Sequence, residues 1–386
     1  MKKKFLFVTT SRADYSQSKN LILKFKRKIP KNFFLLVSGS HLSKKYGKTI
    51  NEILNDRIKP DFKIDILSEK NLHINDNNKI VEIAFKKFNN FFSKFKPDLI
   101  ILLGDRFEML PIAYSAYLKN IKLAHINGGE VTEGSIDEGV RHSLTKLSLF
   151  HFASTNQNRD RIINLGENPK RVLNYGSLGV ESLLKTKFLS KQEILKGLKI
   201  SFNRKNLILT FHPETFETVK NNKKYAQIII NSLKELENIN FFVTSANIDR
   251  SGIEINKLFK SASKKYKNFY YFDSLGKDYY FSLLQYSDGV IGNSSSGIIE
   301  VPSLKKGVVN FGVRQQSRSQ NKSIINTKIN KKEIKKAIKK LYSDKYQQSL
   351  KNNKNEYEKK NTSKNIFNFL INCNLNQPNI KKFYNV

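Results

Sequence analysis

Short runs of large apolar residues alternate along the chain with longer segments of helical spacing. Residues 99–103, with the sequence LIILL, are too few to span a membrane and predict a strand buried on both faces of a sheet. Residues 106–117 follow with the apolar spacing of a helix, and the apolar run at 121–126 predicts a second strand. This order is typical of a βαβ unit, whose two parallel strands end at the same edge of the sheet.

The same alternation continues on both sides of this unit. Further strands are predicted at 4–9, 33–37, 150–154, 172–175, 206–211, 241–244, 269–272, 289–291 and 308–311. Hydrophobicity falls at 185–203, which we interpret as a linker. We therefore expect an α/β protein with an N-terminal domain at 1–184 and a C-terminal domain at 185–362. Residues 363–386 are predicted to be a C-terminal helix and tail, for which packing back on the N-terminal domain is one alternative.

The charge of the chain is strongly positive. Its formal net charge of +36 arises from 69 Lys and Arg residues against 33 Asp and Glu residues, in a chain of 386 residues. Such a balance favours nucleic acid or an anionic surface as partner. However, the excess is mostly lysine spread along the chain, and no nucleic-acid-binding motif accompanies it. We interpret it as a compositional bias and expect neither a nucleic acid nor a membrane as partner.

The number of cysteines limits the classes of protein to which the chain can belong. Cys373 is the single cysteine, which excludes a disulfide within the chain. No pair of Cys and His residues has the spacing of a zinc site, and we expect neither a metal nor another cofactor. The apolar residues at 5–8 are too few for a secretion signal, and no run reaches the roughly 18 apolar residues of a membrane helix. The sequence therefore predicts a cytoplasmic protein.

Three carboxylates follow the predicted strands of the central unit. Asp105 comes after the first strand, Glu130 after the second, and Asp137 one loop later. Because open α/β sheets bind ligands at the carboxyl ends of their strands, Asp105 and Glu130 should face one crevice. Arg141 lies one helical turn beyond Asp137, in a segment predicted as helical at 140–150. Each carboxylate alone could cap a helix or form a surface ion pair, but their joint position favours acid–base chemistry.

The turn after the first strand, TSRADY at 10–15, contains no glycine. A nicotinamide-binding βαβ unit requires a G-x-G-x-x-G turn at this place, so an NAD-dependent epimerase or dehydrogenase is disfavoured. Arg12 instead offers a charged fork that suits phosphate or carboxylate.

A serine-rich loop, GNSSSG at 292–297, stands between a strand and a helix predicted in the second half. Its hydroxyl and backbone N–H groups suit an anion at a helix N-terminus, although the same residues also suit a simple cap. The candidate ligands in it are Ser294, Ser295, Ser296 and Gly297. His212 ends another strand of this half, and Glu300 lies one turn into the helix, where it would accept from sugar or ribose hydroxyls.

Six motifs along the chain resemble those of the hydrolysing UDP-N-acetylglucosamine 2-epimerase family. They are SRADYS, SGSHLSKKYG, GDRFEML, HINGGEVTEGSIDEGVRH, FHPET and GNSSSGIIEVPS. The resemblance implies a GT-B fold, with two Rossmann-like domains and the sugar nucleotide in the interdomain cleft. It also implies conversion of UDP-N-acetylglucosamine and water into N-acetylmannosamine and UDP, the entry step to sialic-acid synthesis in bacteria.

The resemblance further implies roles for single residues. Asp105, Glu130 and Asp137 match the family's catalytic carboxylates. The matches to its ligand contacts are Arg12, Arg141, His212, Ser294, Ser295, Ser296, Gly297 and Glu300. There are departures, because Val313 and Ser317 stand where the commoner motif NIGDRQKGR has Asp and Gly. Since relatives act on UDP- or GDP-linked diacetamido sugars in legionaminic-acid synthesis, the nucleotide and the sugar stay open.

The carboxylates suit the implied reaction. Inversion at C2 requires loss of a weakly acidic proton, which is easier when the nucleotide leaves C1 and a 2-acetamidoglucal forms. One carboxylate would take the proton, and a second, protonated one would return it from the other face. A non-hydrolysing 2-epimerase and a GT-B glycosyltransferase are the rival enzymes, and the latter does not need three carboxylates. The oligomeric state stays open, with a homo-oligomer as one alternative.

Overall fold

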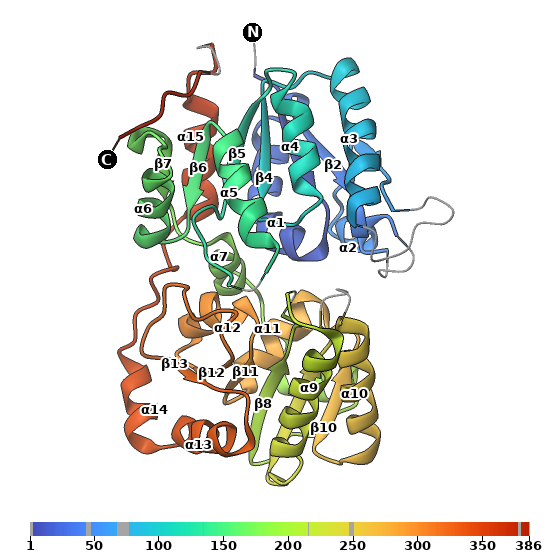
Figure 1. The fold of residues 1–386 in the computed structure, drawn as a ribbon, viewed down its shortest axis with the longest axis vertical. Helices are drawn as coiled ribbons and strands as arrows, with labels where there is room; N and C mark the ends of the chain where they lie inside the picture. Colours follow the sequence, from blue (N-terminus) through green and yellow to red (C-terminus); the bar gives the residue numbers. More distant parts are fainter. Residues whose placement is uncertain are drawn as a thin grey trace. The chain divides into compact units, whose positions relative to one another are not determined.

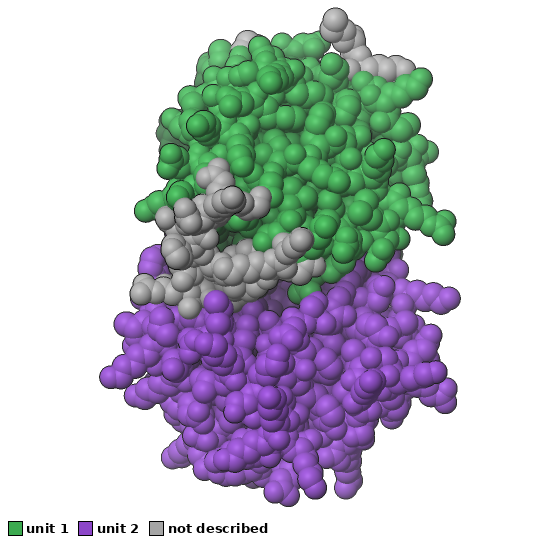
Figure 2. Space-filling model, turned by 90° about the vertical axis from the view of Figure 1, so that its right-hand side faces the viewer, with its two compact units in different colours: residues 1–130, 137–182, 357–386 green, residues 131–136, 183–356 purple. Residues whose placement is uncertain are grey.

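The structure is a computed structural model, and it describes residues 3–43, 48–67, 77–133, 135–214, 216–246, 251–376 and 380–385. In these ranges the strands form two parallel sheets of seven and six strands, with helices on both faces of each (Figure 1). The expected α/β class with two parallel sheets is confirmed. The chain divides into two compact units (Figure 2). Unit 1 comprises Met1–Glu130, Asp137–Ser182 and Tyr357–Val386, and unit 2 comprises Val131–Ile136 and Leu183–Glu356.

The sheet of unit 1 has the strand order β3-β2-β1-β4-β5-β6-β7. Its strands are β1 (Phe5–Thr9), β2 (Phe33–Ser38), β3 (Phe62–Ile64), β4 (Leu99–Leu103), β5 (Lys122–Ile126), β6 (Phe150–Ala153) and β7 (Val172–Asn174). Every residue of β1 and β4 is buried, as expected for central parallel strands with helices on both faces. Strands β1 and β4 pair in parallel, with Phe5 opposite Leu99.

Two helical layers cover this sheet. The helices are α1 (Arg12–Lys28), α2 (Ile50–Asn55), α3 (Asn77–Lys94), α4 (Met109–Tyr117), α5 (Asp137–Leu147), α6 (Asn156–Asn164), α7 (Leu178–Leu184) and α15 (Thr362–Asn372). Helices α1 and α15 pack on one face, where the rings of Phe25 and Phe367 meet edge to face at 4.8 Å. Helices α3, α4 and α5 cover the other face (Figure 1). The C-terminal helix therefore belongs to the core of unit 1.

Unit 2 repeats the plan with the strand order β10-β9-β8-β11-β12-β13. Its strands are β8 (Lys205–Thr210), β9 (Ile239–Thr244), β10 (Phe269–Phe272), β11 (Gly289–Gly292), β12 (Gly307–Phe311) and β13 (Ile324–Thr327). Its helices are α8 (Lys191–Leu198), α9 (Val219–Leu233), α10 (Gly252–Lys265), α11 (Gly276–Tyr286), α12 (Ser295–Ile299), α13 (Lys331–Leu341) and α14 (Asp344–Lys351). Helices α9, α10 and α13 pack on one face of the sheet and α8 and α11 on the other.

The predicted strands agree with the observed ones to within two residues at each end. Strands β3 and β13, at the sheet edges, were not predicted, because each is short and only partly buried. The predicted linker is not featureless, since α8 lies in it and begins with a capping box between Ser190 and Glu193. Helix α5 begins at Asp137, three residues before the predicted start. The apolar spacing at 42–54 predicts a helix, and in this part of the chain the described residues contain α2, whereas 44–47 lie outside them.

Among the described residues, no helix is both long enough and apolar enough to cross a bilayer.

Candidate active site

Both sheets reverse their strand order at one place. In unit 1 the reversal lies between β1 and β4, and in unit 2 between β8 and β11. From this point each sheet grows outward in both directions, which is the doubly wound arrangement of Rossmann-like domains. Ligands of such sheets bind at the carboxyl ends of the strands beside the reversal. The predicted residues follow these strands, Arg12 after β1, Asp105 after β4, His212 after β8 and Ser294 after β11.

The turn that carries Arg12 is fixed by Asp14. The Asp14 carboxylate accepts hydrogen bonds at 2.9 Å from the backbone N–H groups of Thr10 and Ser11, and from the hydroxyl of Thr9. Ser11 caps α1, and Asp14 completes a capping box. Arg12 is therefore the first residue of a firmly capped helix and is half-buried there.

Arg141 joins the ends of β4 and β5. Its side chain is fully buried in α5, and Nε donates to Asp105 Oδ2 at 2.7 Å. Nη2 also donates to this oxygen, and Nη1 donates to the backbone carbonyl of Glu130 at 2.8 Å. Nη1 further donates to Glu138 at 2.5 Å. Burial alone would lower the pKa of Arg141, but the charges of Asp105 and Glu138 outweigh it and raise this pKa.

Glu130 itself is buried, with 3% of its surface exposed. Its Oε1 accepts hydrogen bonds from Asn158 Nδ2 at 2.7 Å and from Ser154 Oγ. The preceding residue, Gly129, has a φ of +74°, and a Cβ there would lie 2.1 Å from the Asn158 carbonyl oxygen. Glycine therefore allows α6 to approach closely enough for Asn158 to hold the carboxylate.

The structure thus brings three of the predicted residues of unit 1 together, namely Asp105, Glu130 and Arg141. Asp137 is the first residue of α5, one turn before Arg141, and is half-buried. His125 lies under the same strand ends, where one ring nitrogen, Nε2, is 2.8 Å from the Gly104 carbonyl oxygen. Burial lowers the pKa of His125 to about 4, so its ring is neutral at neutral pH.

In unit 2 the strand reversal is bridged by Asn293. Its Oδ1 accepts from the backbone N–H of His212 at 2.7 Å, and its Nδ2 donates to the His212 carbonyl oxygen at 2.8 Å. Burial and the charge of Arg314 lower the pKa of His212 to about 3, so the imidazole is neutral. Arg314 donates to the Pro213 carbonyl oxygen at 2.8 Å, and Gln315 to the Asn293 carbonyl oxygen at 3.1 Å.

The serine loop begins α12. The hydroxyl of Ser294 caps this helix by accepting from the Ser296 N–H at 3.4 Å, and Ser295 is its first residue. The hydroxyl of Tyr280, in α11, donates to Ser296 Oγ at 3.1 Å. Burial raises the pKa of Tyr280 to about 12, so it remains a donor.

The end of α12 holds two more predicted residues. Gly297 is buried beneath β12, and a Cβ on it would lie 3.1 Å from Val308 Cγ1. Glu300 ends α12 and is 7% exposed.

Several residues of these clusters were not singled out from the sequence. Glu138, Ser154 and Asn158 contact the predicted residues of unit 1, and Asn293 and Gln315 those of unit 2. For Asn293 a signal was present, since it lies inside the serine-loop motif at a strand end. For Asn158 the sequence contains no such signal, because this residue lies in α6, a helix that follows a later strand.

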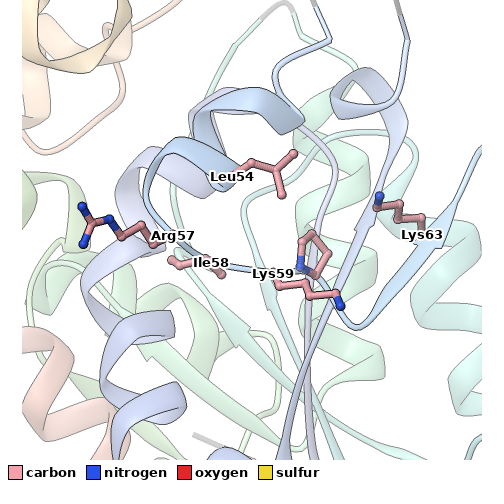
Figure 3. Close-up of a pocket in the computed structure, with 6 residues that line it drawn as sticks. Leu54, Arg57, Ile58, Lys59 and Lys63 are labelled. Atoms are coloured by element: carbon pink, nitrogen blue, oxygen red, sulfur yellow. The ribbon is translucent and has the colours of Figure 1, made fainter.

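A shallow surface pocket of about 400 Å³ lies elsewhere in unit 1 (Figure 3). Its lining consists of Leu54, Arg57, Ile58, Lys59, Pro60 and Lys63, between α2 and β3. It shares no residue with either cluster, and we assign it no function.

Two doubly wound units, one with carboxylates around a buried arginine and one with a serine-rich helix start, define an α/β fold of the GT-B-like class. The chain belongs to the UDP-N-acetylglucosamine 2-epimerase family, whose sequence profile matches residues 25–371. This confirms the family that the six motifs predicted.

Two relatives cover most of the chain. The GDP/UDP-N,N'-diacetylbacillosamine 2-epimerase (hydrolyzing) of Campylobacter jejuni is 36% identical over 318 residues, which are 82% of each chain. The polysialic acid biosynthesis protein P7 of Escherichia coli is 37% identical over 321 residues, 82% of this chain and 80% of that protein. Among solved structures, the UDP-GlcNAc 2-epimerase of Neisseria meningitidis bound to UDP-GlcNAc is 19% identical with a TM-score of 0.81. The match covers 95% of this chain and 99% of that one and confirms the fold.

Proposed function

We propose that the protein is a hydrolysing 2-epimerase of a nucleotide-linked 2-acetamido sugar. Its substrate is UDP-N-acetylglucosamine or a UDP- or GDP-linked diacetamido sugar. Its products are the free 2-epimeric amino sugar, of the N-acetylmannosamine type, and a nucleoside diphosphate. The observation that carries this proposal is the buried guanidinium of Arg141, which binds the half-buried carboxylate of Asp105 and the backbone carbonyl of the buried Glu130 at adjacent strand ends.

The proposed reaction has two steps. In the first, a carboxylate takes the C2 proton, the electron pair of that C–H bond forms the C1–C2 double bond, and the C1–O bond breaks. The electron pair of the C1–O bond leaves with the nucleoside diphosphate. In the second, a carboxylic acid returns a proton to C2 from the opposite face, the electron pair of the double bond forms the new C2–H bond, water adds its oxygen to C1, and the proton that this water loses passes to a carboxylate. Acid–base residues at such steps contribute about 100- to 10,000-fold each, and no metal or cofactor is required.

Unit 1 supplies the proton-transfer groups in this proposal. Asp105, Glu130 and Asp137 are its acid and base residues, and which acts first stays open. Asp105 accepts two hydrogen bonds from the guanidinium of Arg141, one from Nε and one from Nη2. Arg12 and Arg141 contact the substrate or hold the carboxylates that react with it, since a guanidinium suits planar anions.

Unit 2 supplies the nucleotide-binding groups. Ser294, Ser295, Ser296 and Gly297 would donate to the diphosphate, and Glu300 would accept from ribose or sugar hydroxyls. His212, neutral because of its low pKa, would donate one ring N–H to a phosphate oxygen without competing for the C2 proton. Such donors stabilise the charge that develops on the leaving diphosphate.

The names of the relatives indicate which sugar the substrate carries. The Campylobacter relative and a 29% identical Legionella pneumophila protein, over 83% of this chain, are both named hydrolyzing N,N'-diacetylbacillosamine 2-epimerases. These names favour a diacetamido sugar, and the name of the Escherichia coli polysialic acid biosynthesis protein P7 favours the sialic-acid branch. A 28% identical Neisseria meningitidis relative is named UDP-N-acetylglucosamine 2-epimerase, which keeps the monoacetamido sugar and the non-hydrolysing reaction as the second candidate.

Incubation with a panel of UDP- and GDP-linked amino sugars, followed by NMR, tests the proposal. In deuterium oxide we expect a free amino sugar with one deuterium at C2. In oxygen-18 water we expect the label at C1 of the sugar, because elimination breaks the C1–O bond. An intact nucleotide sugar inverted at C2 would place the protein with the non-hydrolysing enzymes. Label in the nucleotide phosphate would replace elimination by attack at phosphorus.

A further inference from the structure

Uncharged side chains hold both oxygens of the Glu130 carboxylate. Ser154 and Asn158 donate to Oε1, and the hydroxyl of Tyr357 donates to Oε2 at 3.4 Å. All four residues are at most 3% exposed, and Tyr357 is among the largest fully buried side chains of the chain. A buried tyrosine hydroxyl normally has a partner, and this one has a carboxylate of the proposed active site.

The donors come from two separate parts of the sequence. Ser154 directly follows β6, the strand next to β5, and Asn158 lies in α6, the helix that comes after it. Tyr357 lies 227 positions after Glu130, at the point where the chain re-enters unit 1. Its contact with Glu130 therefore depends on the fold of the C-terminal segment and not on the local β5–α6 geometry.

The C-terminal segment is well anchored around Tyr357. The Tyr357 carbonyl oxygen accepts from the Ser177 N–H at 2.8 Å. Thr362, the first residue of α15, donates its hydroxyl to the Tyr175 carbonyl oxygen at 2.7 Å. Helix α15 then packs on α1 in the core of unit 1. The backbone that carries Tyr357 is thus held in place by groups other than Glu130.

We propose that Tyr357 is a positioning residue for proton transfer at Glu130, a role that rests on the proposed function. The terminal torsion of a Glu side chain has a broad minimum, so anchoring Oε1 alone leaves the direction of Oε2 loosely defined. A donor at Oε2 narrows that range and directs this oxygen to the reacting carbon. At 3.4 Å the hydrogen bond is long, and catalytic hydrogen bonds of this kind shorten in the Michaelis complex.

Tyr357→Phe tests the role, because it removes the hydroxyl and keeps the ring. We expect kcat to fall about 10- to 100-fold, as for a catalytic group displaced by a fraction of an ångström, while KM and thermal protection by UDP or GDP stay unchanged. The matched control is Tyr346→Phe in unit 2, where the tyrosine is also buried and its hydroxyl donates to the Ser323 carbonyl oxygen at 2.6 Å. This control loses a comparable hydrogen bond and should keep the wild-type kcat.

A double variant separates positioning from general stability. On the Glu130→Gln background, Tyr357→Phe should cause no further loss of the residual rate, because the carboxylate it positions is gone. Equal losses on both backgrounds, or a wild-type kcat in Tyr357→Phe, would refute the positioning role and leave the proposed function intact. A wild-type protein inactive on every sugar of the panel would overturn both. If Tyr357→Phe failed to fold, Ser154→Ala combined with Glu130→Gln would test the same coupling at Oε1.

Discussion

The two units share one strand order but carry different chemistry at the point where that order reverses. In unit 1 this point is ionic, because the buried guanidinium of Arg141 binds the carboxylates of Asp105 and Glu138. In unit 2 it is bridged by an amide, since Asn293 binds both backbone groups of His212. The same scaffold therefore joins its strand ends through an ion pair in one unit and through an amide side chain in the other.

This difference separates two tasks. Buried carboxylates can exchange protons with carbon, provided that neighbours set their charge state. A neutral imidazole, amides and serine hydroxyls change little in charge near neutral pH, so they can hold an anion through a reaction without taking its protons. His212 illustrates the second case, because its pKa of about 3 keeps it uncharged. The following predictions test this division, beginning with the largest effect.

The largest effect is expected from the carboxylates of unit 1. Asp105→Asn, Glu130→Gln and Asp137→Asn should each reduce kcat about 100- to 10,000-fold, because an amide cannot transfer the proton. Thermal protection by UDP or GDP should persist in all three variants, since the proposed nucleotide groups lie in unit 2. Steady-state rates and a thermal shift assay on the same preparations measure both quantities.

The control for this prediction is Glu82→Gln, on the exposed face of α3. It should keep the wild-type rate and the wild-type thermal shift. Near wild-type rates in all three carboxylate variants would show that unit 1 does not carry the proton chemistry, and loss of nucleotide protection in them would break the division between the units.

The next effect is on stability, at one glycine in each unit. A Cβ at Gly129 would lie 2.1 Å from the Asn158 carbonyl oxygen, and a Cβ at Gly292 would lie 1.9 Å from that of Thr210. Gly129→Ala and Gly292→Ala should each cost roughly 3 kcal/mol or more, because backbone must move. Gly104→Ala is the control, since its φ is also positive, at +86°, but nothing lies within 4 Å of the added Cβ.

For Gly104→Ala we expect only about 1 kcal/mol, the cost of the left-handed conformation. Calorimetric unfolding of the three variants measures the difference. Equal losses at all three positions would mean that φ, and not the close backbone approach, requires these glycines.

Apolar runs predicted the central strands of both sheets because these strands are buried on both faces, where every residue must be apolar. Edge strands β3 and β13 are only partly buried, so their sequences lack this signal. The residues at strand ends could also be predicted, because once the strands are known the parallel topology places Asp105 and Glu130 at one edge of the sheet.

The partners of these residues could not be predicted in the same way. Tyr357 and Asn158 reach Glu130 from other elements, and their contacts depend on how α6 and the C-terminal segment pack. No local pattern reports such packing. The reacting groups can therefore be predicted from the sequence more reliably than the groups that hold them in place.

A smaller effect is expected at the serine loop. Replacing Ser294 and Ser295 together by Ala should weaken binding of UDP or GDP roughly 10- to 100-fold, the loss of one or two hydrogen bonds to a charged ligand. The cap of α12 would also weaken, which costs about 1 kcal/mol. Calorimetric titration with the nucleotide measures the affinity, and Ser261→Ala, exposed on α10, is the control. Unchanged affinity in the double variant would remove the serines from the nucleotide site.

The smallest effect concerns a buried glutamate, Glu167, and a half-buried one, Glu214, whose pKa values move in opposite directions. In unit 1, burial alone would raise the pKa of Glu167, but the hydrogen bond from His151 and the ammonium groups of Lys146 and Lys381 lower it to about 2. In unit 2, burial raises the pKa of Glu214. Ionised Glu167 therefore stabilises its unit, whereas ionised Glu214 destabilises its own.

The signs follow from linkage. The pKa of Glu167 is lower in the folded than in the unfolded protein, so its contribution is complete above the unfolded value of about 4.3 and is lost as pH falls toward 2. Glu167→Gln should thus lower the free energy of unfolding by about 1 to 3 kcal/mol at pH 7, and the deficit should shrink below pH 4.5. Glu214 has the raised pKa, so its favourable contribution exists at low pH and is lost as pH rises through that pKa. Glu214→Gln should therefore leave stability unchanged near pH 4 and increase it by less than about 1 kcal/mol at pH 7. Urea unfolding of both variants and wild type between pH 3 and 8 measures these differences. If the two substitutions changed the free energy of unfolding with the same sign at pH 7, the opposite pKa shifts of the two glutamates would be contradicted.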